Sequence, residues 1–258
     1  MQLPAKQRLK LVRQGLLAAL KIGGNVPVAI EDRGGEVSIL VEDRRIAVPS
    51  ALRWKLYRKG WEARLDRLER EYGVGRHVTL GPESVVVDVG ANAGEFAHVC
   101  ARYGARVLCV EPDPKTHACL LRNIEGLETA SAFDAVIWKE DGAVDFGMAP
   151  ERADSSMFAA GAPTVKREAL TLERFARARG LSRIDLVKCD AEGAEPEVLE
   201  GAGEMFANIG AFAIDTGAER NGARTDKECS DILSAHGFTV IEEKIGTRCM
   251  TYGLNPAF

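Results

Sequence analysis

The chain has 258 residues, 46% of them hydrophobic and 28% charged, which is typical of a globular protein that buries one α/β core and carries an appendage. A formal net charge of −4 excludes a global basic field for nucleic acid, and no apolar run approaches the roughly 20 residues that cross a bilayer. The six cysteines form no Cys-x-x-Cys pair, and no secretory signal is evident, so we expect buried thiols in a reducing cytoplasm.

Residues 1–75 are expected to form an N-terminal appendage of helices and short strands. Apolar residues recur at helical spacing across residues 3–22, in a segment rich in Lys and Arg that ends at a Gly-Gly pair. We expect this basic amphipathic helix to pack on the domain or on a partner subunit, which would make a homo-oligomer; proximity to a membrane surface or a glycolipid is the alternative. Residues 36–48 predict two short strands and residues 51–72 a long charged helix.

Strand and helix patterns alternate through residues 76–258. This predicts an α/β domain with a mostly parallel, doubly wound sheet. Strands are expected at 85–89, 106–110, 131–137, 185–189 and 211–215, followed by an antiparallel C-terminal edge of 238–244 and 248–253. Helices are expected at 94–103, 114–125, 172–179 and 226–236, and from Pro196 onward. The Gly-, Pro-, Ala- and Ser-rich stretch 141–164 is expected to hold a hairpin and a mobile loop.

The first strand of this domain runs into a glycine turn that begins at Asp88. Such a βα turn leaves backbone N–H groups free at the carboxyl edge of a sheet, where α/β proteins bind small molecules. The next strand ends in Glu111, which follows Asp88 by 23 residues, close to the spacing at which a carboxylate meets a ribose diol. Both acids also have plainer interpretations, because Asp88 can orient the turn and Glu111 can begin the turn at Pro112.

The turn lacks the glycines of a dinucleotide site. Asn92 and Glu95 stand where Gly-x-Gly-x-x-Gly has its second and third glycines, so a pyrophosphate is blocked and repelled. S-adenosyl-L-methionine has no phosphate, and its sulfonium cation suits a pocket with acids around it. The residues therefore favour S-adenosyl-L-methionine as cofactor, with an NAD-linked oxidoreductase as the alternative.

A second polar group follows the strand 185–189, on the edge expected to carry the glycine turn. Methyl transfer to an alcohol requires an aligned hydroxyl and a destination for its proton. Asp190 is the candidate base or acceptor-orienting group, and Lys188 is expected to keep neighbouring carboxylates ionised. Glu192 is either a third catalytic residue or part of the turn. A divalent metal on Asp190 and Glu192 has no further nameable ligands, so no metal site is predicted.

Together these motifs resemble the FkbM family of S-adenosylmethionine-dependent methyltransferases. The resemblance is carried by Asp-Val-Gly-Ala-Asn at 88–92, by Glu111-Pro112 and by Asp-Ala-Glu-Gly-Ala-Glu at 190–195, and it covers roughly residues 55–250. It implies a Rossmann-like class I methyltransferase fold and O-methylation of a sugar, glycolipid or natural-product hydroxyl. A non-catalytic cofactor-binding module is an alternative, while the acidic balance and the lack of an aromatic-basic face disfavour a nucleic-acid methyltransferase.

The resemblance also implies roles for individual residues. The glycine turn would cradle the methionine portion of the cofactor, Glu111 would hold the ribose, Asp134 would lie near the adenine, and Glu62 and Ser156 would close over the site. The full implied cofactor set is Glu62, Asp88, Gly90, Ala91, Asn92, Gly94, Glu111, Pro112, Asp134, Ala135, Ser156 and Asp190. Ala191 and Asp215 depart from common family residues, and the identity of the acceptor stays open.

Overall fold

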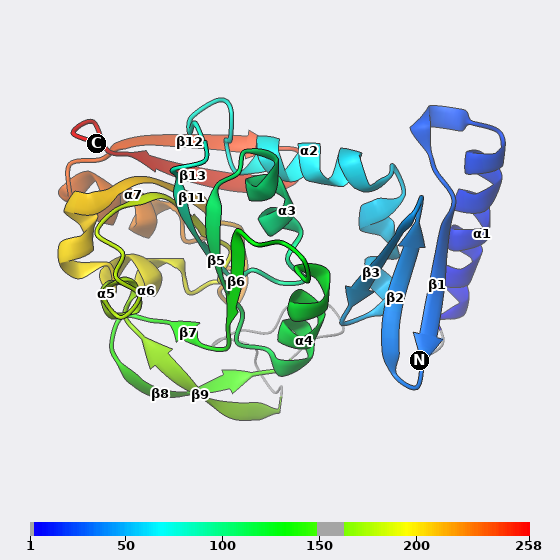
Figure 1. Ribbon diagram of the computed structural model, residues 1–258, viewed down its shortest axis with the longest axis horizontal. Coiled ribbons are helices and arrows are strands. Elements are labelled where there is room, and N and C mark those ends of the chain that lie inside the picture. Colours follow the sequence, from blue (N-terminus) through cyan, green and yellow to red (C-terminus); the bar gives the residue numbers. More distant parts are fainter. Residues whose placement is uncertain (1–2, 149–162) are drawn as a thin grey trace.

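A computed structural model describes residues 3–148 and 163–258. Figure 1 shows a central sheet with helices on both sides, and a smaller N-terminal layer at one end of the molecule. None of the described helices combines the length and the apolarity that crossing a bilayer requires.

The main sheet has seven strands in the described residues, in the order β12-β13-β11-β10-β4-β5-β6. The strands are β4 (Val85–Val89), β5 (Arg106–Val110), β6 (Ala130–Phe133), β10 (Ile184–Cys189), β11 (Ile209–Asp215), β12 (Thr239–Ile245) and β13 (Arg248–Leu254). The run from β11 to β6 is parallel, and β13 inserts antiparallel between β11 and β12. The predicted α/β class, with a mostly parallel sheet and an antiparallel C-terminal edge, is confirmed.

The central strands are buried on both faces, which explains their continuous apolar runs. Val86 belongs to one buried cluster and Val87, its neighbour in β4, to the cluster on the opposite face. The flanking helices are α3 (Glu95–Arg102), α4 (Pro114–Asn123), α5 (Leu172–Arg177), α6 (Glu195–Glu200) and α7 (Asp226–Ala235). Because parallel strands share one carboxyl edge, the loops after β4, β5 and β10 meet at that edge of the sheet.

Two predicted elements are wrong in extent. The strand expected at 131–137 divides: β6 ends at Phe133, and β7 (Val136–Ile137) joins a second sheet with β8 (Gly142–Gly147) and β9 (Thr164–Leu170). The helix expected at 51–72 is a 3-10 helix, Ala51–Tyr57, followed by α2 (Trp61–Glu71). Gly60 separates them because its φ of +97° is a left-handed conformation that ends the first helix.

The β8–β9 pair is antiparallel, but only β8 falls in the stretch 141–164 where a hairpin was expected, because β9 begins at Thr164. The expected mobile loop falls mostly on residues 149–162, outside the described part of the chain.

The N-terminal layer contains α1 (Ala5–Ala19) on a three-stranded antiparallel sheet of β1 (Val28–Arg33), β2 (Glu36–Val41) and β3 (Arg44–Val48). The two predicted strands are confirmed, and β1 is an additional strand. Ile39 and Trp54 of this layer share a buried cluster with Val86 and Phe96 of the main domain. The predicted boundary between residues 75 and 76 therefore crosses a continuous core, and it remains a proposal.

Candidate active site

An open cavity of roughly 670 Å³ lies at the carboxyl ends of β4, β5 and β10. One wall is polar and comes from the loops after those three strands, while β7 and β8 supply an apolar wall that includes Val136, Ile137 and Phe146. The predicted site residues that line this cavity are Gly90, Asn92, Glu111, Pro112, Ala135, Asp190 and Glu192.

The glycine turn is fixed by close contact between two loops. Gly90 has a φ of +71°, and a Cβ added there would overlap the carbonyl oxygen of Asp190. The N–H groups of Gly90 and Ala91 both donate to the Val110 carbonyl, at 3.0 Å each. Only glycine satisfies both the backbone angle and the contact at position 90, so this residue brings three strand ends together.

A buried ion pair lies beneath the turn. Lys188 of β10 is the register partner of Asp88 in β4, and its Nζ lies 2.8 Å from Asp88 Oδ1, with the two side chains 5% and 0% exposed. Lys188 Nζ also donates to the Gly90 carbonyl at 2.7 Å. Burial alone lowers the pKa of Lys188, but the carboxylates of Asp88 and Asp190 raise it above its usual value. The ammonium therefore stays charged and holds the turn from below.

Glu111 is held by backbone donors at the end of β5. One oxygen accepts from Asn92 N and the other from Asp113 N, both at 2.9 Å. Each carboxylate oxygen keeps a second lone pair for a further donor. Burial is the main cause that raises the pKa of Glu111, to about 7. This carboxyl can therefore receive hydroxyl groups from the cavity and changes charge near neutral pH.

Asp190 is held by two residues that the sequence analysis missed. Its Oδ2 accepts from the Tyr72 hydroxyl and from Arg248 Nη1, both at 2.9 Å. Arg248 also forms an ion pair with Asp215, at the end of β11. Tyr72 follows α2 and Arg248 begins β13, so two distant segments converge on the rim. No motif in either segment marks them.

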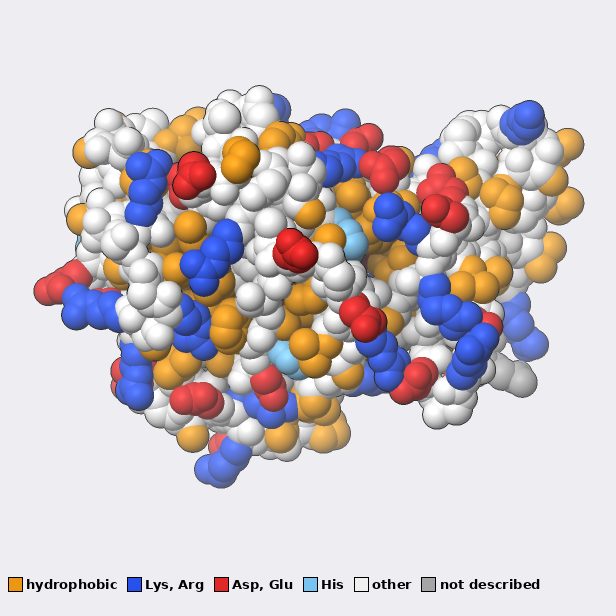
Figure 2. Space-filling view, in the orientation of Figure 1, with side chains coloured by type: hydrophobic (Ala, Val, Ile, Leu, Met, Phe, Trp, Pro, Cys, Tyr) orange, Lys and Arg blue, Asp and Glu red, His pale blue; other side chains and the backbone are white. Residues whose placement is uncertain are grey.

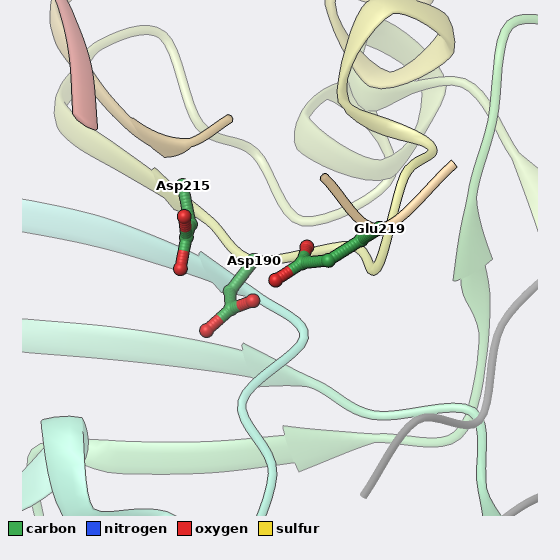
Figure 3. Close-up of side chains that lie close together, drawn as sticks. All are labelled: Asp190, Asp215 and Glu219. Carbon is green, nitrogen blue, oxygen red and sulfur yellow. The ribbon is translucent and has the colours of Figure 1, made fainter. Parts of the chain in front are cut away.

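Three carboxylates from the ends of β10 and β11 and the loop after β11 lie close together at this rim. Figure 3 shows Asp190, Asp215 and Glu219 together, with Asp190 and Glu219 pointing toward each other. Each offers an oxygen within 4.8 Å of the others, but Arg248 already pairs with two of the three. Arg248 therefore balances part of the negative charge of this cluster.

The three acids differ in proton affinity. Despite its burial, Asp190 has a pKa well below the usual range, because Arg248 and Lys188 favour its charged form. Burial and the neighbouring Asp190 charge raise the pKa of Asp215 to about 6. The same two causes raise the pKa of Glu219 to about 9. The rim thus contains one fixed negative charge beside a carboxyl that holds a proton at neutral pH.

Two buried arginines form a second polar wall next to the glycine turn. Arg53 and Arg64 line a smaller cavity together with Asn92, and both lie near Glu95 Oε1, at 3.8 and 3.5 Å. The Nε atoms of both arginines are buried and have no hydrogen-bond partner among the described residues. Because buried donors are normally paired, these two N–H groups are available to a bound acceptor. Arg53 lies in the 3-10 helix and Arg64 in α2, and sequence reasoning missed both.

The remaining predicted residues lie elsewhere. Ala91 lines the smaller cavity, and Gly94 is the N-cap residue before α3, with a φ of +86°. Glu62 is on α2, where it pairs with Arg102 at 2.6 Å and has a side chain 67% exposed. Asp134 pairs with Arg167 at 3.3 Å next to the cavity-lining Ala135. Glu62 and Asp134 are not among the residues that line the described cavities, and their roles stay predictions, as does that of Ser156, which lies outside the described residues.

Fold and site together define an α/β protein with a small-molecule cavity at the carboxyl edge of a parallel sheet. A family model described as the methyltransferase FkbM domain matches residues 88–239, more than half of the chain, so the protein belongs to this family. The predicted family is confirmed, and with it S-adenosyl-L-methionine as the cofactor. The NAD-linked alternative is thereby excluded.

The named relatives are distant. The 2-O-methyltransferase NoeI of Sinorhizobium fredii is 26% identical over 145 residues, which is 48% of this chain and only 60% of that protein. An S-adenosylmethionine-dependent methyltransferase from Aquifex aeolicus superposes with a TM-score of 0.48 and 13% identity, covering 80% of this chain and 94% of that one. The fibrillarin pre-rRNA processing protein of Methanococcus jannaschii superposes with a TM-score of 0.48 and 14% sequence identity, covering 90% of this chain and 99% of that one. Structural likenesses this distant carry no argument about the substrate.

Proposed function

We propose that the protein methylates a hydroxyl oxygen of a sugar-containing acceptor, such as a glycolipid or a glycosylated natural product. The observation that carries the proposal is the rim at Asp190, where a fixed carboxylate and a proton-holding carboxyl lie side by side. The name of the NoeI relative, a 2-O-methyltransferase, supports the choice of oxygen as the methylated atom.

The cofactor fits the residues that surround the two cavities. The Glu111 carboxylate, with a free lone pair on each oxygen, is the proposed partner of the ribose hydroxyls. The unpaired Nε donors of Arg53 and Arg64 suit the carboxylate of the methionine portion. When bound, S-adenosyl-L-methionine supplies the methyl group from its sulfonium sulfur and leaves as S-adenosylhomocysteine.

The acceptor is positioned by Asp190. Its Oδ2 is occupied by Tyr72 and Arg248, whereas its Oδ1 accepts no hydrogen bond from the described residues. Oδ1 is therefore proposed to accept from the hydroxyl of the acceptor and to fix its direction of attack. Because the pKa of Asp190 is held low, the proton does not remain on this residue.

Glu219 is the proposed destination of that proton. Its oxygen lies within 4.8 Å of a carboxylate oxygen of Asp190, and its raised pKa of about 9 makes it the strongest proton acceptor of the three when ionised. The O–H bond of the acceptor breaks, the proton moves to Glu219, and the oxygen forms a methyl ether. A positioned base contributes typically about 10²–10⁴-fold to such a step.

A cleft suited to the acceptor adjoins the rim. It is open to solvent and is lined by residues of the 3-10 helix and α2 on one side and by Asn92, Asp190 and Glu192 on the other. Charged side chains such as Lys55 and Arg67 on its walls favour a polar acceptor that offers many hydrogen-bonding groups.

The test compares Asp190→Asn and Glu219→Gln with Asp231→Asn, an exposed carboxylate of α7 that serves as control. Methyl transfer from labelled S-adenosyl-L-methionine to a panel of oligosaccharides and glycolipids is measured, and the methyl ether is located by mass spectrometry. We expect both rim variants to lower kcat by about 10²–10⁴-fold with S-adenosylhomocysteine affinity retained, and the control to behave as wild type.

The pH profile separates the two roles. Turnover of the wild type is expected to rise toward about pH 9 as Glu219 ionises, and Glu219→Gln should remove this rise. Full turnover by Asp190→Asn, or methyl transfer only to nitrogen or carbon atoms, would contradict the proposal.

A further inference from the structure

Helix α1 turns an apolar stripe toward solvent. Four large hydrophobic side chains on its outer face are more exposed than any other large hydrophobic side chain in the described residues: Leu9 72%, Val12 62%, Leu16 61% and Leu20 68%. Their spacing of three or four residues places them on one side of the helix. Figure 1 shows α1 at the outer end of the molecule, and Figure 2 shows hydrophobic side chains projecting from that end.

The opposite face of α1 is fixed to the protein. Gln14 and Ala18 are buried, and Gln14 Nε2 donates to the carbonyl oxygens of Val26 and Arg58 at 3.0 and 2.8 Å. Leu11 packs on the cluster that includes Ile39. The helix therefore cannot roll to bury its outer stripe without breaking these contacts, and the stripe is a stable surface feature.

Positive charge surrounds the stripe. Residues 1–30 contain five Lys and Arg and no Asp or Glu, a charge of +5; since the whole chain carries −4, the remaining residues carry −9. At 100° per residue, Lys6 and Arg13 lie on one side of the stripe and Arg8 on the other. These three side chains are exposed and have no ion-pair partner in the described part of the chain.

This combination of charge and apolarity selects one kind of partner. A second copy bound through the same face would bring two sets of unpaired cations together, which is unfavourable. A different face of a second copy has no comparable apolar patch to contact the stripe. The other large exposed hydrophobics among the described residues are Leu121 and Phe258, which are isolated, and Ile22, which follows the stripe. An apolar stripe flanked by cations matches the acyl chains and anionic headgroups of a lipid surface.

We infer that α1 docks the protein on an anionic membrane surface, lying in the plane of the interface with Leu9, Val12, Leu16 and Leu20 among the acyl chains. Lys6, Arg8 and Arg13 reach the headgroups from both sides of the stripe. The strongly acidic remainder is repelled by the same surface, so docking orients the molecule with α1 toward the lipid. This inference does not depend on the acceptor proposed above.

Sedimentation with vesicles tests it. The full chain is mixed with phosphatidylcholine vesicles with and without phosphatidylglycerol, at low and at high salt. We expect binding only to the anionic vesicles and a loss of binding near 1 M salt, where the screening length is about 3 Å. Each of Leu9→Glu and Leu16→Glu should weaken vesicle binding by roughly tenfold or more.

Leu121→Glu is the matched control, because Leu121 is 51% exposed on α4, away from the stripe. It should bind vesicles as the wild type does, and all three variants should bind S-adenosylhomocysteine normally, which shows that they are folded. Failure of the wild type to bind anionic vesicles, or equal loss in the Leu121 variant, would overturn the inference. The inference would also be overturned if the wild type were a dimer that did not bind vesicles and Leu16→Glu converted it to a monomer.

Discussion

The buried pair of Lys188 and Asp88 gives the sharpest prediction, because its charges lie 2.8 Å apart with side chains 5% and 0% exposed. At an effective dielectric constant of about 20 their attraction is about 6 kcal/mol, most of which offsets the cost of removing both charges from water. Removing one partner leaves the other charge buried and unpaired. We therefore expect Lys188→Met to lower the free energy of unfolding by about 3–5 kcal/mol near pH 8.

The loss should depend on pH. Burial already raises the pKa of Asp88, and without Lys188 it should rise further above its unfolded value. A group whose pKa is higher in the folded than in the unfolded protein stabilises the fold at low pH. This stabilisation is lost as the pH rises through the folded-state pKa. The variant should therefore lose up to about 1.4 kcal/mol per pH unit relative to wild type, and the defect should be smaller near pH 6 than near pH 8.

Urea unfolding followed by circular dichroism measures these values, with the double variant Asp88→Asn, Lys188→Met as control. Two neutral partners leave no buried charge, so the double variant should recover at least half of the lost stability and lose the pH dependence. Equal, pH-independent destabilisation in both variants would refute the reasoning. A stable Lys188→Met that binds S-adenosylhomocysteine but does not turn over would instead assign Lys188 to the chemistry.

Two further predictions concern cofactor binding, measured by calorimetry with S-adenosylhomocysteine. Gly90→Ala adds a Cβ that would overlap the Asp190 carbonyl oxygen at a φ of +71°, so affinity should fall at least about tenfold. Stability should fall by at least about 1–2 kcal/mol, the cost of the positive φ alone, whereas Gly81→Ala, with open space around it, should be neutral. Affinity should also fall as pH drops below about 7, because protonation of Glu111 removes an acceptor; Glu111→Gln should bind more weakly at about pH 8 and show no such pH dependence. The raised pKa of Glu111 likewise costs the cofactor-free protein up to about 3 kcal/mol of stability as pH rises from about 5 to about 8, a cost that Glu111→Gln should remove. Wild-type affinity in Gly90→Ala, or an unchanged pH profile in Glu111→Gln, would contradict these expectations.

Much of the fold and part of the site could be predicted because the signals are local. The strands 85–89 and 106–110 are apolar runs bounded by turns, and the structure has them at the same residues. Parallel strands share a carboxyl edge, so the residues that follow β4, β5 and β10 were expected to meet. Gly90, Glu111 and Asp190 do meet at one cavity.

Other features depend on where the chain turns. The strand expected through residue 137 ends at Phe133, because Val136 and Ile137 pair with Leu170 and its neighbour, a partner far along the chain. The helix expected across Gly60 is interrupted at the positive φ of Gly60, and the carboxylate of Glu42, which accepts from Trp61 N, occupies the space that a side chain there would need. Neither partner can be identified from the local pattern.

The sequence by itself determined the class of protein, the cofactor and the edge of the sheet that we propose binds it, because those depend on residue order within a few strands and turns. Only the tertiary structure decided what surrounds Asp190, since Tyr72 and Arg248 arrive from segments with no motif of their own. It also decided which face of α1 meets solvent. Helical periodicity shows that an apolar stripe exists, but whether the stripe is covered depends on contacts, such as those of Gln14, between segments distant in the chain.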